Sequence, residues 1–255
     1  MKITVLGSGT SQGVPVIACE CEVCKSLDYR DQRLRPSILI EVDDLSIIID
    51  TGPDFRQQML RGGIKKLDAV LYTHQHKDHT AGMDDLRSFN FKQEKDVPIF
   101  GRKSVIDQLR QEFSYVFVDK DKKYPGVLNV DVNYIENKPF KINEVEIIPI
   151  DVLHYKLPVF GFRIKDFTYL TDVSHIPDEE FEKIKGSRFV IIDALQKEDH
   201  ISHFTLNQAV EISQKLNPEK AYFTHISHKM GLHADIEKEL PENIELSYDG
   251  LVIEC

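Results

Sequence analysis

A cluster of metal-binding residue types follows a short apolar strand in this 255-residue chain. Residues 69–73 (AVLYT) have the composition of a buried strand, and the next residues follow the spacing H-x-H-x-D-H. His74 and His76 are two apart in extended chain and can point the same way. Asp78 and His79 fall where a new helix is expected, so they face a second position. The competing interpretation is a solvated polar turn, but this spacing at a strand end favours two adjacent metal ions.

Short apolar runs alternate with helical patterns, and no linker, repeat or low-complexity stretch divides the chain. The pattern predicts strands at 3–6, 37–42, 46–50, 69–73, 145–150, 160–164, 168–171, 189–193 and 221–224. It predicts helices at 54–61, 104–113, 178–184 and 206–216. Early hairpins and later helices between strands predict an α/β chain with mixed sheets, in a single domain over residues 1–255.

The charge balance bears on partners and location. The chain has 32 basic and 42 acidic residues, which gives a net charge of -10. This field disfavours a long nucleic-acid partner but is compatible with a small charged substrate. The N-terminus lacks a signal-peptide pattern, and no run approaches the roughly 18 apolar residues of a membrane span. We therefore expect a cytoplasmic protein with no membrane partner.

A cysteine cluster, CECEVC, provides three thiols close to the N-terminus: Cys19, Cys21 and Cys24. In a reducing compartment such a cluster favours metal ligation over disulfides, the alternative being three inert buried thiols. Three thiolates are one short of a tetrahedral zinc site, so a fourth ligand must come from elsewhere. His228 is a candidate because it lies three residues beyond His225 and can turn away from it.

Two segments, THQHKDHTAGMDDLRSF and IIIDTGPDFR, closely resemble the signature of the metallo-β-lactamase superfamily. The resemblance covers essentially the whole chain and implies a four-layer αββα sandwich of two mixed sheets, with a dinuclear site at one sheet edge. It also implies three further ligands at strand ends. The implied assignment places His74, His76 and His154 on one ion, Asp78, His79 and His225 on the other, and Asp172 between them. Asp50 would orient ligands through hydrogen bonds, or could equally be only a turn-former.

The segment GSGTSQGVPVIACECEVCKSLD resembles a narrower group, the phosphoribosyl cyclic phosphodiesterases of phosphonate breakdown. This resemblance implies a structural zinc in a loop at about residues 18–25, two active-site ions (manganese or zinc), and a homodimer. The zinc ligands would be Cys19, Cys21, Cys24 and His228. Pyrroloquinoline quinone biosynthesis protein B shares a similar cysteine segment but lacks a regular H-x-H-x-D-H loop. Ribonuclease Z shares that loop but not the cysteines, and its basic tRNA-gripping arm has no counterpart here.

The combined pattern predicts a metal-dependent hydrolase of small cyclic or nucleotide-like phosphodiesters, acting through a hydroxide generated between two metal ions. Asp78 belongs to the predicted catalytic set. His203 precedes the Thr205 helix cap and matches the family position for proton donation or phosphate contact, although His200 could exchange roles with it. Three basic residues could contact phosphate or simply be solvated: Arg33, Arg35 and Lys156. A nuclease, a thioester or lactam hydrolase, and a non-catalytic cofactor-biosynthesis protein stay open, because fold does not fix substrate.

Overall fold

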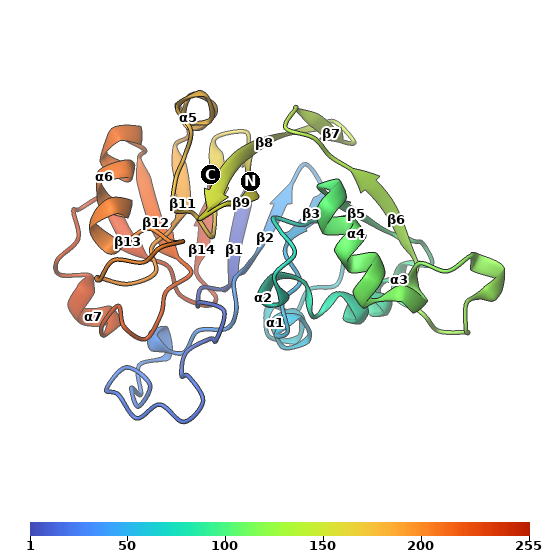
Figure 1. Cartoon of the computed structure of the whole chain (residues 1–255), viewed down its shortest axis with the longest axis horizontal. Helices are drawn as coiled ribbons and strands as arrows, with labels where there is room; N and C mark the ends of the chain where they lie inside the picture. Colours follow the sequence, from blue (N-terminus) through green and yellow to red (C-terminus); the bar gives the residue numbers. More distant parts are fainter.

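Two seven-stranded β-sheets lie face to face with helices on both outer sides (Figure 1). The computed structural model describes the backbone of residues 1–255 and every side chain except that of Lys120. The first sheet has the strand order β14-β1-β2-β3-β4-β5-β6, and the second has the order β13-β12-β11-β10-β9-β8-β7. Both sheets mix parallel and antiparallel pairs. The predicted αββα sandwich is therefore confirmed.

The strands of the first sheet are β1 (Lys2–Gly7), β2 (Ser37–Val42), β3 (Leu45–Ile49), β4 (Ala69–Leu71), β5 (Val97–Gly101), β6 (Val130–Tyr134) and β14 (Val252–Glu254). Those of the second are β7 (Phe140–Ile142), β8 (Val145–His154), β9 (Leu157–Ile164), β10 (Phe167–Leu170), β11 (Phe189–Asp193), β12 (Lys220–Thr224) and β13 (Ile244–Leu246). Every predicted strand is present, with ends shifted by a few residues. Strands β5, β6, β7, β13 and β14 were not predicted.

The helices are α1 (Phe55–Gly62), α2 (Lys77–Thr80), α3 (Arg87–Gln93), α4 (Lys103–Glu112), α5 (Asp178–Ile184), α6 (Leu206–Leu216) and α7 (His233–Ile236). Short 3-10 turns occur at Tyr29–Asp31, Met83–Leu86, Ser114–Val116 and Lys120–Lys122. The predicted start of α6 is confirmed in detail, because Thr205 and Gln208 form a reciprocal capping box. Within the described part of the chain, no helix has both the length and the apolar character needed to cross a membrane.

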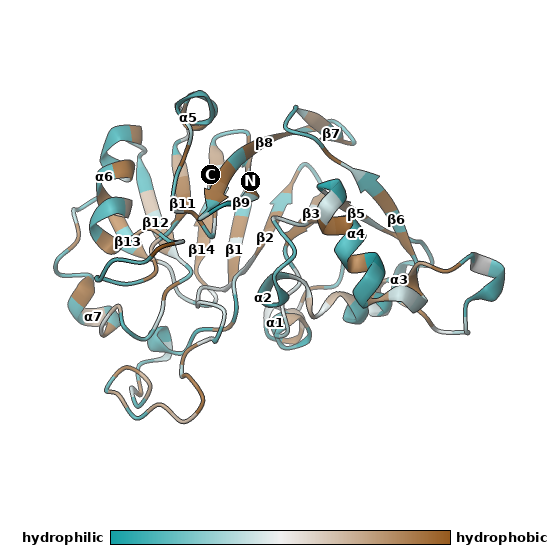
Figure 2. Ribbon diagram, in the orientation of Figure 1, coloured by the Kyte–Doolittle hydropathy of each residue, from teal (hydrophilic) through white to brown (hydrophobic). Residues whose placement is uncertain are grey.

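Apolar side chains fill the layer between the sheets and both helix–sheet layers. The middle layer joins strands from both halves, with Ile38 and Ile47 of the first sheet packed in one cluster with Phe160 and Tyr169 of the second. Figure 2 shows the same arrangement as hydrophobic colour along the strands and hydrophilic colour on the outward faces of the helices. Burial of this layer is the main force that holds the two sheets together.

The parallel strands of each sheet end at the same edge of the sandwich. β3 and β4 run parallel in the first sheet, as do β10, β11 and β12 in the second. A hydrogen bond from Phe160 N to Thr73 O (3.1 Å) joins the two sheets at this edge. Residues that follow these strands are therefore brought to one place, although they come from distant parts of the sequence.

Candidate metal centres and active site

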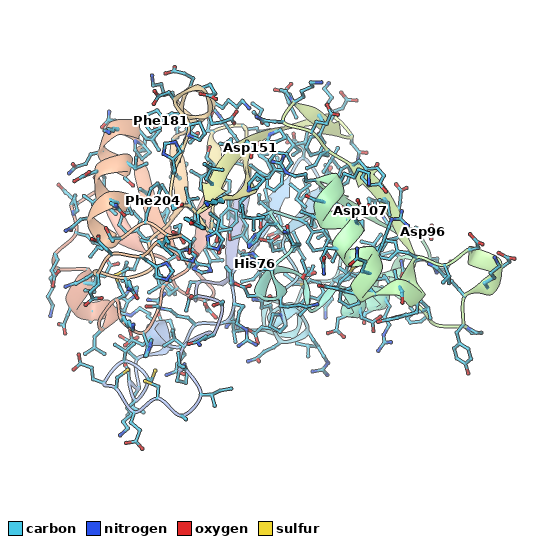
Figure 3. All side chains as sticks on the ribbon, in the orientation of Figure 1. His76, Asp96, Asp107, Asp151, Phe181 and Phe204 are labelled. Atoms are coloured by element: carbon cyan, nitrogen blue, oxygen red, sulfur yellow. The ribbon has the colours of Figure 1, made fainter. Side chains whose placement is uncertain are left out.

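The seven predicted ligands of the dinuclear site lie together at this edge. Asp78, His79, Asp172 and His225 place ligand atoms within 4.8 Å of one another, and so do His74, His76 and Asp172. His154 lies within the same range of Asp172 and His203. Figure 3 places His76 centrally, between the α1–α4 side and the α5–α7 side of the molecule. Asp172 is thus shared by both groups, the arrangement expected if it bridges two ions; the assignment of ions stays a prediction.

Asp50 and Thr73 orient His79 and His74 through hydrogen bonds to Nδ1 of each ring. Asp50 Oδ2 accepts from Nδ1 of His79 (2.7 Å) and from the Thr73 hydroxyl (2.8 Å), and Asp50 Oδ1 accepts from the Thr73 amide (2.9 Å). Because the Thr73 hydroxyl donates to Asp50, its oxygen is free to accept from Nδ1 of His74 at 3.0 Å. In both imidazoles Nδ1 is therefore engaged by the protein and Nε2 is turned towards the centre, as ligation of a metal through Nε2 requires.

Strand-end backbone conformation contributes to the same convergence. Asp50, Asp172 and His225 each follow a strand and have left-handed φ values of 65°, 56° and 60°. A non-glycine residue in this region is uncommon, and such residues concentrate at functional sites. His154 is the last residue of β8. Its Nδ1 donates to Ser202 O at 2.8 Å, which leaves Nε2 as the ring nitrogen available to a metal ion.

Unpartnered buried nitrogens test whether these residues fit metal ions. Among the described residues, Nε2 of His74, His79 and His225 is buried without a hydrogen-bond partner. Two of them face carboxylate oxygens: His79 Nε2 lies 3.0 Å from Asp172 Oδ2, and His225 Nε2 lies 3.4 Å from Asp172 Oδ1. Imidazole nitrogens and carboxylate oxygens converging in this way form a donor set for divalent metals. The residues therefore fit divalent metal ions.

The electrostatics of the cluster favour bound positive charge. Burial alone would lower the pKa of His79, but the carboxylates of Asp78, Asp172 and Asp50 raise it well above its usual value. Burial would likewise lower the pKa of His225, yet the carboxylates of Asp172, Asp78 and Asp193 raise it to about 9. Carboxylates held this close together are stabilised by cations, whether protons on imidazole or divalent ions.

His203 lies against the His/Asp cluster and is hydrogen-bonded to Asp193, which was not predicted from the sequence. The His203 ring centroid lies 4.6 Å from that of His154 and 4.7 Å from that of His225. His203 Nδ1 donates to Asp193 Oδ1 at 3.2 Å, and Asp193 Oδ2 accepts the amide of Phe204 at 3.1 Å. Asp193 is the last residue of the apolar strand β11, and Asp172 lies two residues beyond the apolar strand β10. An aspartate at the end of an apolar strand was therefore the sequence signal that could have identified Asp193. His200 is exposed, with its ring centroid 5.0 Å from that of His203.

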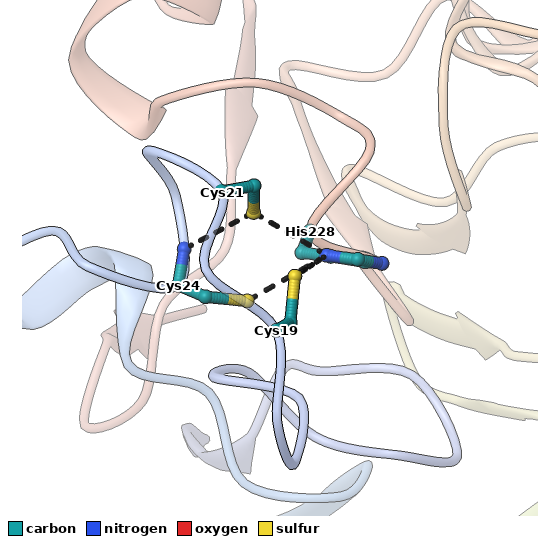
Figure 4. A group of neighbouring side chains, drawn as sticks. All are labelled: Cys19, Cys21, Cys24 and His228. Atoms are coloured by element: carbon teal, nitrogen blue, oxygen red, sulfur yellow. Dashed lines mark hydrogen bonds between the residues drawn. The ribbon is translucent and has the colours of Figure 1, made fainter.

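The three cysteines and His228 form a second cluster (Figure 4), apart from the first. The thiol sulfurs of Cys19, Cys21 and Cys24 lie 3.2, 3.4 and 3.6 Å from Nδ1 of His228. Tetrahedral zinc with usual Zn–S and Zn–N bond lengths requires S···N separations of about 3.5 Å, so the four residues fit one zinc ion. The Cys24 amide donates to Cys21 Sγ, and with burial opposing it, the pKa of the Cys21 thiol is lowered to about 6, which favours the thiolate.

Three basic residues considered as phosphate contacts have different surroundings. Arg33 is buried and donates to Ser8 Oγ and Ser247 O, and burial lowers its pKa to about 10. Arg33 therefore does not contact a phosphate, because its guanidinium is buried and hydrogen-bonded within the protein. Lys156 is exposed, with Nζ 5.2 Å from the Tyr155 ring centroid. Arg35 lines a hollow beside Asp78.

Two hollows flank the His/Asp cluster. One, of about 420 Å³, is lined by Asp78 together with Arg35, Ile17 and Pro53. The other, of about 510 Å³, is lined by His76 and His154 together with Tyr155, Lys156 and Ile201. Each hollow thus shares a wall with one of the two ligand groups, so a molecule reacting at the centre can extend in both directions.

Comparison with known proteins agrees with this arrangement. Residues 46–226 match the family model for the beta-lactamase superfamily domain. The chain belongs to this superfamily of metallo-hydrolases. Its fold, with a His/Asp cluster at the sheet edge, also implies divalent metal ions.

A more specific relationship comes from individual proteins. A crystal structure described as a new diphosphatase from the PhnP family superimposes with a TM-score of 0.93 at 39% identity, over 100% of this chain and 97% of that one. Zn(2+)-bound PqqB from Methylobacterium extorquens superimposes with a TM-score of 0.81 at 17% identity, over 100% of both chains, and shows the fold alone. The chain is therefore related to the PhnP family.

One curated relative is longer than this chain. The chain is 40% identical to an octanoyltransferase of Porphyromonas gingivalis over 255 residues. This match covers 98% of the present chain. The chain spans only 51% of that octanoyltransferase, about half its length. The name of that whole protein therefore assigns no activity to the present chain.

Proposed function

We propose that this protein hydrolyses small phosphoric diesters, including diesters of diphosphoric acid, at the dinuclear cluster. The observation that carries the proposal is the pair of ligand groups sharing Asp172, with the Asp193–His203 pair directly beside them. Two divalent ions held there, manganese or zinc, would lower the pKa of a water molecule and neutralise charge on phosphate oxygens.

The reaction requires a balanced transfer of protons. The water oxygen forms a new bond to phosphorus while the bond from phosphorus to the leaving oxygen breaks, and the leaving oxygen takes that electron pair. The water loses one proton, and the leaving oxygen needs one. The proton lost by the water passes to solvent. The leaving oxygen takes its proton from Nε2 of a His203 ring that carries a proton on each nitrogen, because Nδ1 is engaged with Asp193 and the ring faces His154 and His225; His203 then regains a proton from solvent. Asp193 acts on the reaction only by fixing this ring.

Several considerations favour small diesters over the alternatives. The relationship to a PhnP-family diphosphatase at 39% identity supports phosphorus–oxygen cleavage over thioester or lactam cleavage. The net charge of -10 disfavours a long nucleic-acid substrate. The full set of seven ligands, with a proton donor beside it, favours an enzyme over a non-catalytic cofactor-biosynthesis protein. A single structural zinc at the cysteine cluster, the homodimer and the cytoplasmic location stay predictions.

The proposal is tested with the purified protein and its metals. We expect about three metal ions per chain and cleavage of bis(p-nitrophenyl) phosphate much faster than of p-nitrophenyl phosphate, nitrocefin or a glutathione thioester. The double variant His74→Ala/Asp172→Ala should lose diester cleavage, whereas His175→Ala, at an exposed histidine outside the ligand groups, should retain it. Full diester activity in the double variant, or faster cleavage of the thioester or lactam, contradicts the proposal.

A further inference from the structure

The hollow beside Asp78 contains a cation whose terminal nitrogens have no partner in the described part of the chain. Arg35 reaches this hollow with its Nε 3.0 Å from Asp54 Oδ2, and none of the described hydrogen bonds or ion pairs involves Nη1 or Nη2. Lys77 lines the same hollow, but its Nζ is paired with Glu112 Oε2 at 2.6 Å. Each of the two cations has one carboxylate partner, but the Arg35 side chain is 26% exposed against 65% for Lys77, so Arg35 is the more firmly enclosed cation with unused donors.

The fold holds Arg35 in place from several sides. Its amide donates to Asp54 Oδ2 at 2.8 Å, and its carbonyl accepts from Nε2 of the fully buried Gln58 at 2.8 Å. The guanidinium passes close to Gly13, where an added Cβ would lie 3.1 Å from Nη1, and the φ of +68° also favours glycine there. A guanidinium fixed in this way loses little conformational entropy when it binds an anion.

The position of Arg35 relative to Asp78 indicates what it binds. Both side chains line one hollow, and an added Cβ at Gly52 would touch both residues, 2.1 Å from Asp78 O and 3.4 Å from Arg35 Cβ. A phosphorus atom reacting at the cluster would therefore have Arg35 on its Asp78 side. The planar fork of guanidinium donors matches phosphate oxygens.

We propose that Arg35 is a specificity-determining residue that binds the second, non-reacting phosphoryl group of a diester of diphosphoric acid. One organic group of this substrate extends past Ile17 and Pro53 on the Arg35 side. The other occupies the opposite hollow, where the half-exposed Tyr155 ring offers a stacking surface. This inference rests on the proposed function and adds the substrate class: a diphosphate with organic groups at both ends, cleaved at the bridging P–O bond.

A matched pair of substrates isolates the second phosphoryl group. Bis(p-nitrophenyl) phosphate releases p-nitrophenolate, whereas P1,P2-di(p-nitrophenyl) diphosphate, with one more phosphoryl group, gives two p-nitrophenyl phosphates when cleaved at the bridge; the products are separated by chromatography, and the ratio of variant to wild type is compared for each substrate. We expect wild-type kcat/KM to be at least about tenfold higher for the diphosphate. Arg35→Gln should lower that value between about 10- and 100-fold, the range that a hydrogen bond to a charged group supplies, and lower the single-phosphorus value less than about threefold. Arg35→Lys should recover part of the loss.

Controls separate substrate contact from folding. Arg56→Gln, at an exposed residue of α1 that lines a different hollow, should leave both substrates unaffected. Unfolding midpoint and metal content should match the wild type in every variant. Equal losses on both substrates in Arg35→Gln, no loss on either, or a wild type without diphosphate preference overturns the proposal while leaving the proposed function intact. A wild type that cleaves neither substrate with manganese or zinc overturns both.

Discussion

Replacing Gly52 by alanine tests how closely the loop after β3 and helix α2 must approach for the metal centre to form. Thr51 N donates to His79 O at 2.7 Å, and Gly82 N donates to Thr51 O at 2.8 Å, so Thr51, the residue before Gly52, is bound both to helix α2 and to the turn after it. An alanine Cβ at this position would lie 2.1 Å from the carbonyl oxygen of Asp78, whereas real Cβ contacts stay above 3.0 Å. One segment must therefore move by nearly 1 Å.

The expected effect of this displacement falls on catalysis more than on folding. A misplacement of about 1 Å costs on the order of 100-fold in rate, whereas overpacking at one site costs about 1–3 kcal/mol of unfolding free energy. We expect Gly52→Ala to lower kcat/KM for bis(p-nitrophenyl) phosphate by about this factor and to bind fewer ions. Gly63→Ala is the control for adding a methyl group without a clash, since nothing lies within 4 Å of the added Cβ; its φ of +61°, unlike that of Gly52, is left-handed, so any loss of stability there comes from the backbone conformation. A Gly52→Ala protein with activity within threefold of wild type and full metal content refutes this reasoning.

Three other perturbations address the proton donor, the zinc cluster and a buried carboxylate. Asp193→Asn should lower kcat by about 10²- to 10⁴-fold with metal content unchanged and shift the pH–rate profile, because His203 loses the acceptor that fixes its proton; an unchanged pH profile contradicts this. Cys21→Ser should lose one zinc per chain and unfold at lower temperature, since a closed zinc site contributes folding energy; normal stability with a full metal count contradicts it. Glu180→Gln should cost about 1–2 kcal/mol at pH 7. Burial would raise the pKa of Glu180, but hydrogen bonds from Lys183, Asn137 and the Asp151 amide lower it. The difference in unfolding free energy between wild type and Glu180→Gln should therefore shrink as pH falls through this lowered pKa. A difference that does not change with pH in urea unfolding contradicts this prediction.

The elements with strong local signals could be predicted from sequence, and those stabilised by neighbours could not. Helix α6 was predicted at its observed bounds because its N-cap Thr205 and the Pro218 that follows its end are local signals. β5 was not predicted, since Pro98 removes a donor from an apolar run. The structure accommodates this proline because pairing with β4 begins only at Ile99. β14 has three residues and exists through its pairing with β1, a contact between the two ends of the chain.

The same distinction applies to the candidate site: residues in one contiguous motif could be predicted from local spacing, and residues brought together by the fold could not. The H-x-H-x-D-H loop is contiguous, so its spacing alone indicated a metal site. His154, Asp172 and His225 were reached through family resemblance, because nothing local connects three strand ends that are far apart in sequence. Asp193 had the same strand-end position but no place in the expected ligand set. Its role becomes visible only when β11 lies next to β12 and brings His203 and His225 to the same carboxylate.

Arg33 and Arg35 show why side-chain role cannot be deduced from composition. The two arginines are two residues apart in the same segment before β2, and the sequence gives no basis for treating them differently. The fold separates them: Arg33 is enclosed by Ser8, Ser247 and His233, whereas Arg35 lies over Gly13 and faces the hollow beside Asp78. A cation whose donors are used within the protein stabilises the loops around it, whereas a fixed cation with unused donors beside a reaction centre is available to a substrate anion. The glycine-rich loop before the cysteines thus does more than lead to the cysteine cluster: at Gly13 it leaves room for the Arg35 guanidinium beside the hollow at Asp78.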